Sequence, residues 1–160
     1  MNDRIRAVAL GNDPADLLIK NGRVVDVLTG EIYEANVAIA EGVIAGVGDY
    51  HEGKRIVDAT GKYILPGFIN THCHVESSMA TPQNYCAEEL RWGVTTLITD
   101  PHEIANVAGA KGVKYMLEAT RNLPVNYYVQ VPSCVPATPF EHAGCVMDAE
   151  AMAELLDLDG

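Results

Sequence analysis

The sequence of 160 residues predicts an α/β protein built from two parts. Hydrophobic residues make up 48% of the chain and charged residues 21%, a composition typical of a globular protein. Residues 1–65 contain short apolar runs separated by glycine-containing turns, which predicts a small antiparallel β-domain. In residues 66–160, apolar strand-like runs alternate with helical patterns, which predicts a parallel sheet covered by helices.

Three hairpins are predicted in residues 1–65, because residue pairs that tolerate positive φ separate neighbouring apolar runs. The predicted turns are Asn21-Gly22, Glu41-Gly42 and residues 59–62. Thr29-Gly30 is expected to form a further turn between strands. Residues 1–15 carry few signals beyond a turn at Asp13-Pro14, so no element is predicted there.

The second part is predicted to contain strands at residues 67–74, 94–99 and 125–131. Thr81-Pro82 resembles an N-cap followed by proline in the first helical turn, and Gly93 is a suitable helix stop. A loop is expected around residues 100–109, followed by a helix over residues 110–121. Asp148 is expected to cap a last helix, in which Met152, Leu155 and Leu156 share a face.

His72 and His74 lie at the end of the first of these strands. Side chains alternate along a strand, so the two imidazoles share a face and Cys73 points to the other side. Two imidazoles on one face can converge on a metal ion. The alternative interpretation is a polar strand end that carries two unrelated histidines.

Other polar residues also follow strand ends: Asp100, His102 and Glu103 after the second strand, and Ser133 and Cys134 after the third. Ligands of parallel α/β sheets bind at the carboxyl ends of the strands. This clustering predicts a site with His72 and His74 as metal ligands. Glu76, Ser77, Asp100, Ser133 and Cys134 are expected to contact substrate or to orient the ligands.

Composition excludes some partners. Eleven basic against 22 acidic residues give a net charge of −11, which disfavours nucleic acids and anionic membranes. No apolar segment approaches a membrane span or a secretory signal. The four cysteines show no C-x-x-C spacing, so we expect reduced thiols and a cytoplasmic location.

The stretch Ile64-Leu65-Pro66-Gly67-Phe68-Ile69-Asn70-Thr71-His72-Cys73-His74 resembles the first barrel strand of the amidohydrolase superfamily. Three further stretches resemble the adenine deaminase family within it: Val75-Glu76-Ser77-Ser78-Met79, Asp100-Pro101-His102-Glu103-Ile104-Ala105-Asn106-Val107, and residues 132–141. The resemblance covers the chain from about Asp16 onward. It implies that residues 1–65 belong to a composite small β-domain and that residues 66–160 are the first three β/α units of an incomplete TIM-type (β/α)8 barrel.

The resemblance also implies hydrolysis of adenine to hypoxanthine and ammonia, a reaction of purine salvage. The implied cofactor is a dinuclear centre of manganese or iron, with zinc as an alternative, in which His72 and His74 match the first two ligands. A divalent metal can make water a nucleophile near neutral pH, and an acid or base then carries a proton to the leaving amine. His102 and Glu103 are the candidate catalytic residues, with roles in holding metal or substrate left open. Alternatively, His102 and Glu103 only begin a helix, and the carboxylate of Glu103 interacts favourably with the positive end of the helix dipole.

A closed (β/α)8 barrel takes roughly 250 residues, and three strands are predicted here. We therefore expect an N-terminal part of a larger enzyme, inactive by itself and homo-oligomeric when complete. Two alternatives remain: another amidohydrolase, such as a dihydroorotase-like or cytosine-deaminase-like enzyme, and a non-catalytic remnant. An open sheet edge predicts that the isolated chain is poorly soluble or oligomeric.

Overall fold

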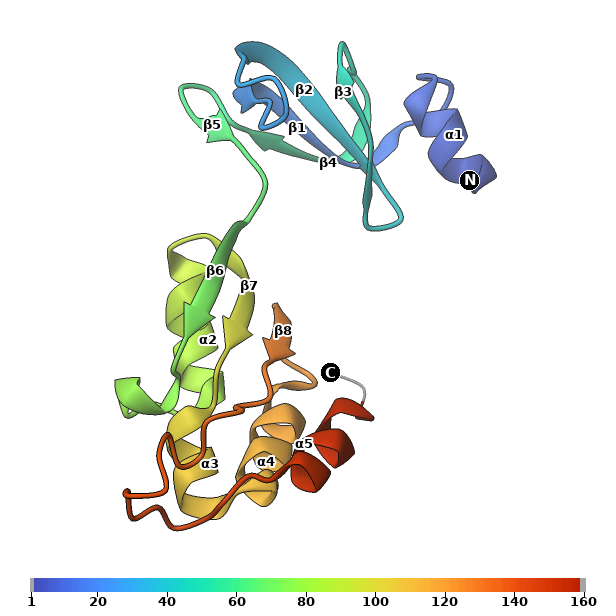
Figure 1. Ribbon diagram of the computed structural model, residues 1–160. Coiled ribbons are helices and arrows are strands. Elements are labelled where there is room, and N and C mark those ends of the chain that lie inside the picture. The colour runs from blue at the N-terminus through green and yellow to red at the C-terminus, as the bar shows by residue number, and fades with distance from the viewer. Residues whose placement is uncertain (1, 159–160) are drawn as a thin grey trace. The chain divides into compact units, whose positions relative to one another are not determined.

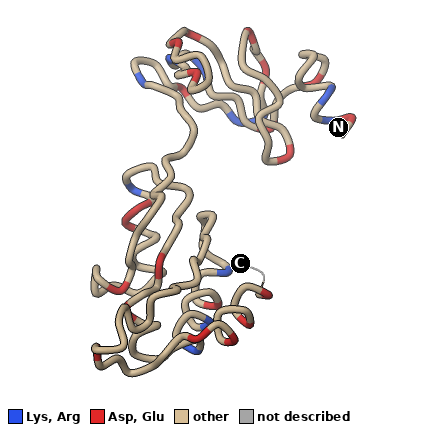
Figure 2. The backbone as a smooth tube through the Cα atoms, viewed as in Figure 1, with Lys and Arg blue, Asp and Glu red and all other residues tan. Residues whose placement is uncertain are grey.

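The computed structural model describes residues 2–158 and divides into two compact units at Pro66 and Gly67 (Figure 1). Each unit has its own sheet, and helices accompany both, so the predicted α/β class is confirmed. Acidic residues are distributed along both units, and fewer basic residues are interspersed among them (Figure 2). Among residues 2–158, no helix is long and apolar enough to cross a membrane.

The first unit is a five-stranded sheet with a short helix at its start. Its elements are α1 (Asp3–Ala9), β1 (Ala15–Val25), β2 (Ile32–Ala40), β3 (Val43–Gly48), β4 (Gly53–Asp58) and β5 (Tyr63–Ile64). The strand order is β3-β2-β1-β4, and β5 also pairs with β1. β2 is antiparallel to β1 and β3, but β4 and β5 run parallel to β1. The prediction of a purely antiparallel domain is therefore wrong, and the sheet is mixed.

One of the three predicted hairpins is present. Glu41 and Gly42 connect β2 to β3 with φ angles of 51° and 79°, as predicted. Asn21 instead lies inside β1 at a shift in register, with φ of 63°. Its backbone N–H donates to Asn36 Oδ1 and its Nδ2 donates to Asp58 Oδ1, at 3.0 Å each. These contacts with neighbouring segments hold Asn21 in the sheet as a bulge, so the chain does not reverse there.

The third predicted hairpin is also wrong. β4 and β5 lie one after the other along the same edge of β1, in the same direction. Ala59, which follows β4, donates its N–H to the carbonyl of Lys20 at 2.8 Å. Lys62 then donates back to Ala59 at 2.9 Å, which closes a tight turn. The chain therefore remains beside β1 and does not fold back on β4.

Helix α1, which was not predicted from the sequence, packs on the first sheet through the buried Val8 and the partly buried Ile5. Val8 joins Leu18, Ala15, Ala38 and Ala40 in the core of this unit. The side chain of Asn2 caps the helix by accepting from the N–H of Arg4 at 2.9 Å. Ile5 and Val8 have helical spacing, but α1 has only 7 residues, which is too short for a clear periodic pattern, so the helix was missed.

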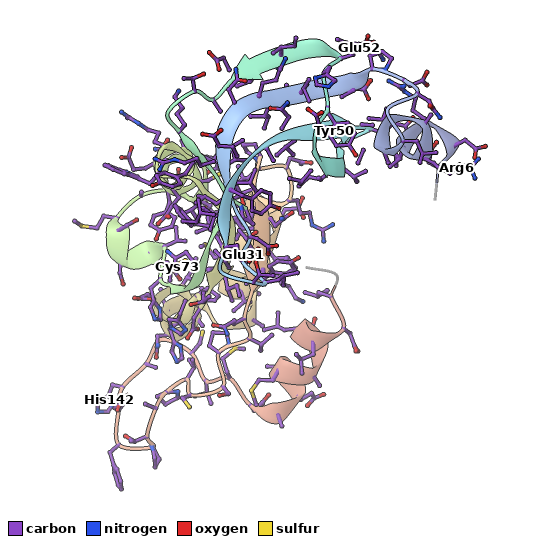
Figure 3. The ribbon with its side chains drawn as sticks, turned by 90° about the horizontal axis from the view of Figure 1, so that it is seen from above. Arg6, Glu31, Tyr50, Glu52, Cys73 and His142 are labelled. Carbon is purple, nitrogen blue, oxygen red and sulfur yellow. The ribbon has the colours of Figure 1, made fainter. Side chains whose placement is uncertain are left out.

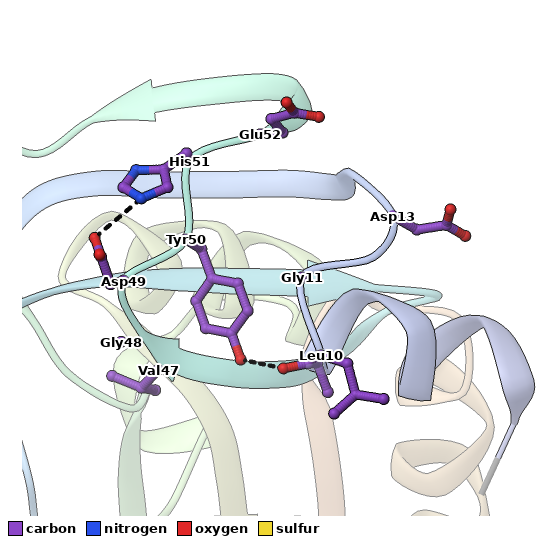
Figure 4. Close-up of a pocket in the computed structure, with 10 residues that line it drawn as sticks. Leu10, Gly11, Asp13, Val47, Gly48, Asp49, Tyr50, His51 and Glu52 are labelled. Carbon is purple, nitrogen blue, oxygen red and sulfur yellow. Dashed lines mark hydrogen bonds and ion pairs between the residues drawn. The ribbon is translucent and has the colours of Figure 1, made fainter.

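A cavity of about 470 Å³ opens between the end of α1 and the segment that joins β3 to β4 (Figure 4). Tyr50 crosses it and donates its hydroxyl to the carbonyl of Ala9 at 2.9 Å. His51 lies 3.4 Å from Asp49 at the rim. Both of these rim side chains are largely exposed, and the cavity lies in the first unit, whereas the polar strand ends belong to the second.

The second unit contains a parallel sheet in the order β6-β7-β8, which is also the order along the chain. Its elements are β6 (Phe68–Cys73), η1 (Glu76–Ser78), α2 (Pro82–Arg91), β7 (Val94–Thr99), α3 (His102–Ala108), α4 (Ala110–Thr120), β8 (Asn126–Val129) and α5 (Ala149–Leu156). The three predicted parallel strands are present, with β8 shorter than expected. Residues 102–108 form a helix where a loop was expected.

Helix ends in the second unit follow the predicted signals. Thr81 Oγ1 accepts from the N–H of Asn84 at 3.4 Å, with Pro82 in the first turn of α2. Gly93 has φ of 84° directly after that helix. Asp148 accepts from the N–H of Ala151 at 2.8 Å and caps α5. These short-range signals were sufficient because each cap involves residues three positions apart.

Two buried clusters form the core of the second unit. One contains Cys73, Val75, Leu97 and Met116, and the other contains Ala105, Val113, Val135, Met147 and Leu155. The predicted face of α5 is correct for Met152 and Leu155 but wrong for Leu156, which is 72% exposed. Burial raises the pKa of the Cys73 thiol, so Cys73 is a neutral core side chain, as predicted.

Candidate metal centre

The ends of β6 and β7 are joined by the carbonyl of Cys73. The N–H of Asp100 donates to this oxygen at 2.8 Å, and the hydroxyl of Thr99 donates to it at 3.2 Å. Thr99 is fully buried, so its hydroxyl contact is shielded from water. Because the Cys73 side chain enters the core, His72 and His74 project on the opposite side of the strand. The joined ends thus place these histidines beside Asp100.

The donor atoms of His72, His74 and Asp100 all lie within 4.8 Å of one another. The two Nε2 atoms of the histidines are 3.1 Å apart, and Nε2 of His72 is 3.9 Å from Asp100 Oδ2. The Asp100 side chain is 15% exposed, whereas that of His72 is 56% exposed. The predicted convergence of the two histidines is confirmed, and Asp100 joins them as a third donor.

This donor set suits a divalent cation. Two imidazole nitrogens bound to one ion at about 2.1 Å are about 3.0–3.4 Å apart for bond angles near 90–110°, and the observed 3.1 Å lies in that range. Two imidazoles with one carboxylate match the ligand types of zinc and of iron or manganese. The alternative is an ordinary hydrogen bond, in which one ring N–H donates to the other ring nitrogen.

His102 connects two segments of the site. Its Nδ1 lies 2.9 Å and 3.0 Å from the two carboxylate oxygens of Asp100, and its Nε2 lies 3.2 Å from the carbonyl of Cys134. The hydrogen bond to Asp100 raises the pKa of His102, burial opposes this in part, and the Cys134 carbonyl adds to the increase. The ring therefore joins the end of β7 to the segment after β8.

Glu103 contacts the second histidine. Its Oε2 lies 3.2 Å from Nδ1 of His74, and its Oε1 accepts a hydrogen bond from the hydroxyl of Ser77. Partial burial raises the pKa of Glu103, but the hydrogen bonds from Ser77 and from its own backbone N–H, together with His74, lower it overall. Glu103 is consequently a carboxylate at neutral pH, facing the ring edge of His74 opposite Nε2.

Glu76 supports the start of α3. Its Oε1 accepts from the N–H of Ile104 at 3.2 Å, while its buried Oε2 has no hydrogen-bond partner among residues 2–158. An acceptor on an early helical N–H satisfies a donor that the helix itself leaves free. Glu76 therefore fixes the helix that carries His102 and Glu103.

The structure gathers six of the nine sequence-predicted site residues into one network through their side chains: His72, His74, Ser77, Asp100, His102 and Glu103. Glu76 is linked to this network only through the backbone N–H of Ile104 in α3. Cys134 enters the network only through its backbone carbonyl, and its thiol lies 3.7 Å from the Ser133 hydroxyl. Thr99, whose hydroxyl helps to hold the ends of β6 and β7 together, was not identified from the sequence. A threonine at the end of an apolar strand could have indicated such a contact. His142 lies on a loop that extends from the rest of its unit (Figure 3).

Comparison with known proteins agrees with this architecture. Residues 63–158 match the model of the amidohydrolase family, which is more than half of the chain. The chain therefore belongs to the amidohydrolase family. Among curated relatives, it is 52% identical over 149 residues to an adenine deaminase from Listeria welshimeri, and 56% identical over 144 residues to one from Oceanobacillus iheyensis.

These alignments cover 93% and 90% of this chain but only 26% and 25% of the two relatives. The chain thus spans about a quarter of the length of the relatives it matches. Among solved structures, it resembles N-acyl-D-glutamate deacylase from Bordetella bronchiseptica, complexed with zinc and a phosphonate inhibitor. The TM-score is 0.63 at 20% identity, over 90% of this chain and 36% of the deacylase, which supports the fold.

Proposed function

We propose that these residues form the N-terminal part of an adenine deaminase, which hydrolyses adenine to hypoxanthine and ammonia. The observation that carries this proposal is the 52% identity to a curated adenine deaminase over 93% of the chain. The grouping of His72, His74 and Asp100 at adjacent strand ends supports it, because a hydrolase of this kind needs a metal centre there.

The proposal extends to the architecture. We assign β6, β7 and β8 as the first three strands of a (β/α)8 barrel, with residues 66–160 as its start and residues 1–65 as a small domain. The sequential order of three parallel strands supports this, because barrel strands are neighbours in chain order. Adenine as the ligand, a cytoplasmic location and self-association of the complete enzyme belong to the same proposal.

His72, His74 and Asp100 would hold a divalent cation, manganese or iron by preference, with zinc as an alternative. Three donors are too few for two ions, so a dinuclear centre would draw further ligands from residues outside this stretch. Ser133 and Cys134, after the next strand, are proposed to face the substrate. The Asp100 side chain is 15% exposed and that of Glu103 is 43% exposed, so Asp100 is the better shielded of these two carboxylates.

In the proposed reaction, the oxygen of water forms a bond to the purine carbon that carries the amino group. The bond from that carbon to nitrogen breaks, and a proton from the water passes to the amine, which leaves as ammonia. A cation held by these residues would supply Lewis-acid activation of the water. His72, His74 and Asp100 would hold the ion at the strand ends.

The test uses the polypeptide encoded by the whole reading frame to which these residues belong, produced with manganese. Ammonia release from adenine is expected, and His72→Asn or His74→Asn should weaken metal binding and abolish turnover. His142→Gln, which changes an exposed loop histidine, is the matched control and should retain both. A protein that binds metal but releases no ammonia from adenine would contradict the substrate assignment.

A further inference from the structure

The first turn of α3 carries two neighbouring residues that contact two different donors of the candidate metal centre. His102 contacts Asp100, and Glu103 contacts His74. Sequence alone allowed both residues to be an acid, a base or a ligand. The geometry of their contacts supports another role, which the two residues share.

Glu103 determines which nitrogen of His74 carries the proton. Nδ1 of His74 faces the Glu103 carboxylate at 3.2 Å, and a carboxylate only accepts hydrogen bonds. The proton therefore belongs on Nδ1, which leaves the lone pair of Nε2 directed toward His72, 3.1 Å away. The other carboxylate oxygen of Glu103 is held by Ser77, so the carboxylate cannot rotate freely.

His102 is fixed at both ring nitrogens. Nδ1 faces the Asp100 carboxylate and Nε2 faces the backbone carbonyl of Cys134, and both partners are acceptors. Neither nitrogen has a lone pair directed at open space, so His102 is poorly placed to bind an ion or to receive a proton from substrate. The ring instead restrains the Asp100 carboxylate, whose Oδ2 lies 3.9 Å from His72.

We infer that His102 and Glu103 are positioning residues, each of which orients one ligand of the metal centre: His102 orients Asp100, and Glu103 orients His74. This inference rests on the proposed metal centre. Metal-binding histidines commonly donate their second ring N–H to a carboxylate, which fixes the tautomer and raises the basicity of the ligand. Glu76 holds the N–H of Ile104, next in the same helix, and so fixes both positioning residues together.

The first test needs no metal. Nitrogen-15 NMR of the imidazole rings in the metal-free chain should show His74 with its proton on Nδ1. In Glu103→Ala, the His74 proton should shift toward Nε2, whereas Glu103→Gln should largely retain the parent tautomer, because the amide oxygen still accepts. His142→Gln should change nothing at His74. An unchanged His74 tautomer in Glu103→Ala would overturn the role of Glu103.

The second test measures the affinity of the chain for Co²⁺ by visible absorption. Loss of an orienting partner typically weakens a site by about 10–100-fold, so His102→Ala and Glu103→Ala should each show a loss of this size. Glu103→Gln should recover part of it. Because His102 acts through Asp100, adding His102→Ala to Asp100→Ala should cause no further loss. An additive loss would instead make His102 an independent ligand and overturn its positioning role.

The two tests separate this inference from the proposed function. If His72→Ala and His74→Ala leave Co²⁺ binding unchanged, the metal centre itself fails and the inference about orienting its ligands fails with it. If metal binding follows the expected pattern but the complete protein releases no ammonia from adenine, only the substrate assignment fails. Both outcomes are read independently, because neither NMR nor Co²⁺ absorption depends on turnover.

Discussion

Gly67, between Pro66 and the start of β6, is the residue at which a single added methyl group should disturb the strand that carries the histidines. A Cβ atom built on Gly67 would lie 2.0 Å from Thr95 Oγ1, 2.5 Å from Thr95 Cγ2 and 2.8 Å from Thr95 Cβ. Rotation of the threonine side chain can relieve the first two contacts but not the third. Gly67→Ala must therefore separate the starts of β6 and β7.

Overpacking of this kind typically costs about 1–3 kcal/mol, so we expect Gly67→Ala to destabilise the second unit by that amount. Urea unfolding followed by far-UV circular dichroism measures the loss, and amide hydrogen exchange of residues 67–75 locates it. Thr95→Ala removes the two nearest atoms but leaves Cβ, so the double variant should regain part of the stability. The favourable coupling between the two changes should be about 0.5–3 kcal/mol.

The matched control is Gly61→Ala in the first unit, where an added Cβ meets no atom within 4 Å, although φ of 74° strains the backbone. It should leave hydrogen exchange of residues 67–75 unchanged. The steric reasoning is refuted if the urea midpoint of Gly67→Ala equals that of the parent protein. It is also refuted if adding Thr95→Ala to Gly67→Ala restores no stability.

Three further outcomes are expected. Leu97→Ala removes a fully buried side chain from β7 and should cost about 2–5 kcal/mol; a urea midpoint close to the parent value would contradict the core assignment. Thr81→Ala removes the N-cap of α2 and should cost about 0.5–2 kcal/mol, with Thr81→Ser as the control that retains the hydroxyl. The hydrogen bond from Lys54, with those from the Glu41 N–H and Arg4, holds the pKa of Asp16 far below its usual value. Its contribution to stability is therefore complete above the unfolded-state pKa of about 3.9 and declines as the pH falls below it. Asp16→Asn should flatten the acid side of the stability profile, and an unchanged profile would count against this network.

Short-range signals in the sequence predicted much of the second unit. Thr81 with Pro82, Gly93 and Asp148 marked helix ends correctly, because a cap depends on residues within one helical turn. Helix α3 was missed, with a loop predicted in its place, for a related reason. Its N-cap is Pro101, which makes no side-chain cap hydrogen bond. The support from Glu76, 28 positions earlier in the chain, is invisible to local patterns.

The first unit shows the limit of turn signals. Asn21-Gly22 and Glu41-Gly42 look alike in sequence, and Asn21 and Glu41 both adopt positive φ. Only Glu41-Gly42 reverses the chain, because Asn21 is held in the sheet by Asn36 and Asp58. These partners lie 15 and 37 positions away, so local sequence cannot distinguish a bulge from a hairpin.

Within the site, sequence placed His72 and His74 on one face because strand periodicity alone determines it. It grouped Asp100, His102 and Glu103 with them but could not assign their partners. The pairing of Glu103 with His74, 29 positions apart, depends on how α3 turns away from β7. Roles that depend on which atoms of two side chains face each other therefore follow only from the three-dimensional structure.

The central strand of the first sheet bears on how the chain assembles during synthesis. β1 accepts β2 on one edge through a nearby turn, but its other edge is completed by β4 and β5, with Leu18 opposite Ile56 and Arg23 opposite Tyr63. These parallel pairings span about 40 positions and form late, because long loops close at an entropic cost. Until residues 53–64 have left the ribosome, β1 is an edge strand with unpaired N–H and carbonyl groups. A nascent chain that has emerged from the ribosome only as far as about residue 50 should therefore be the species most prone to associate with other chains.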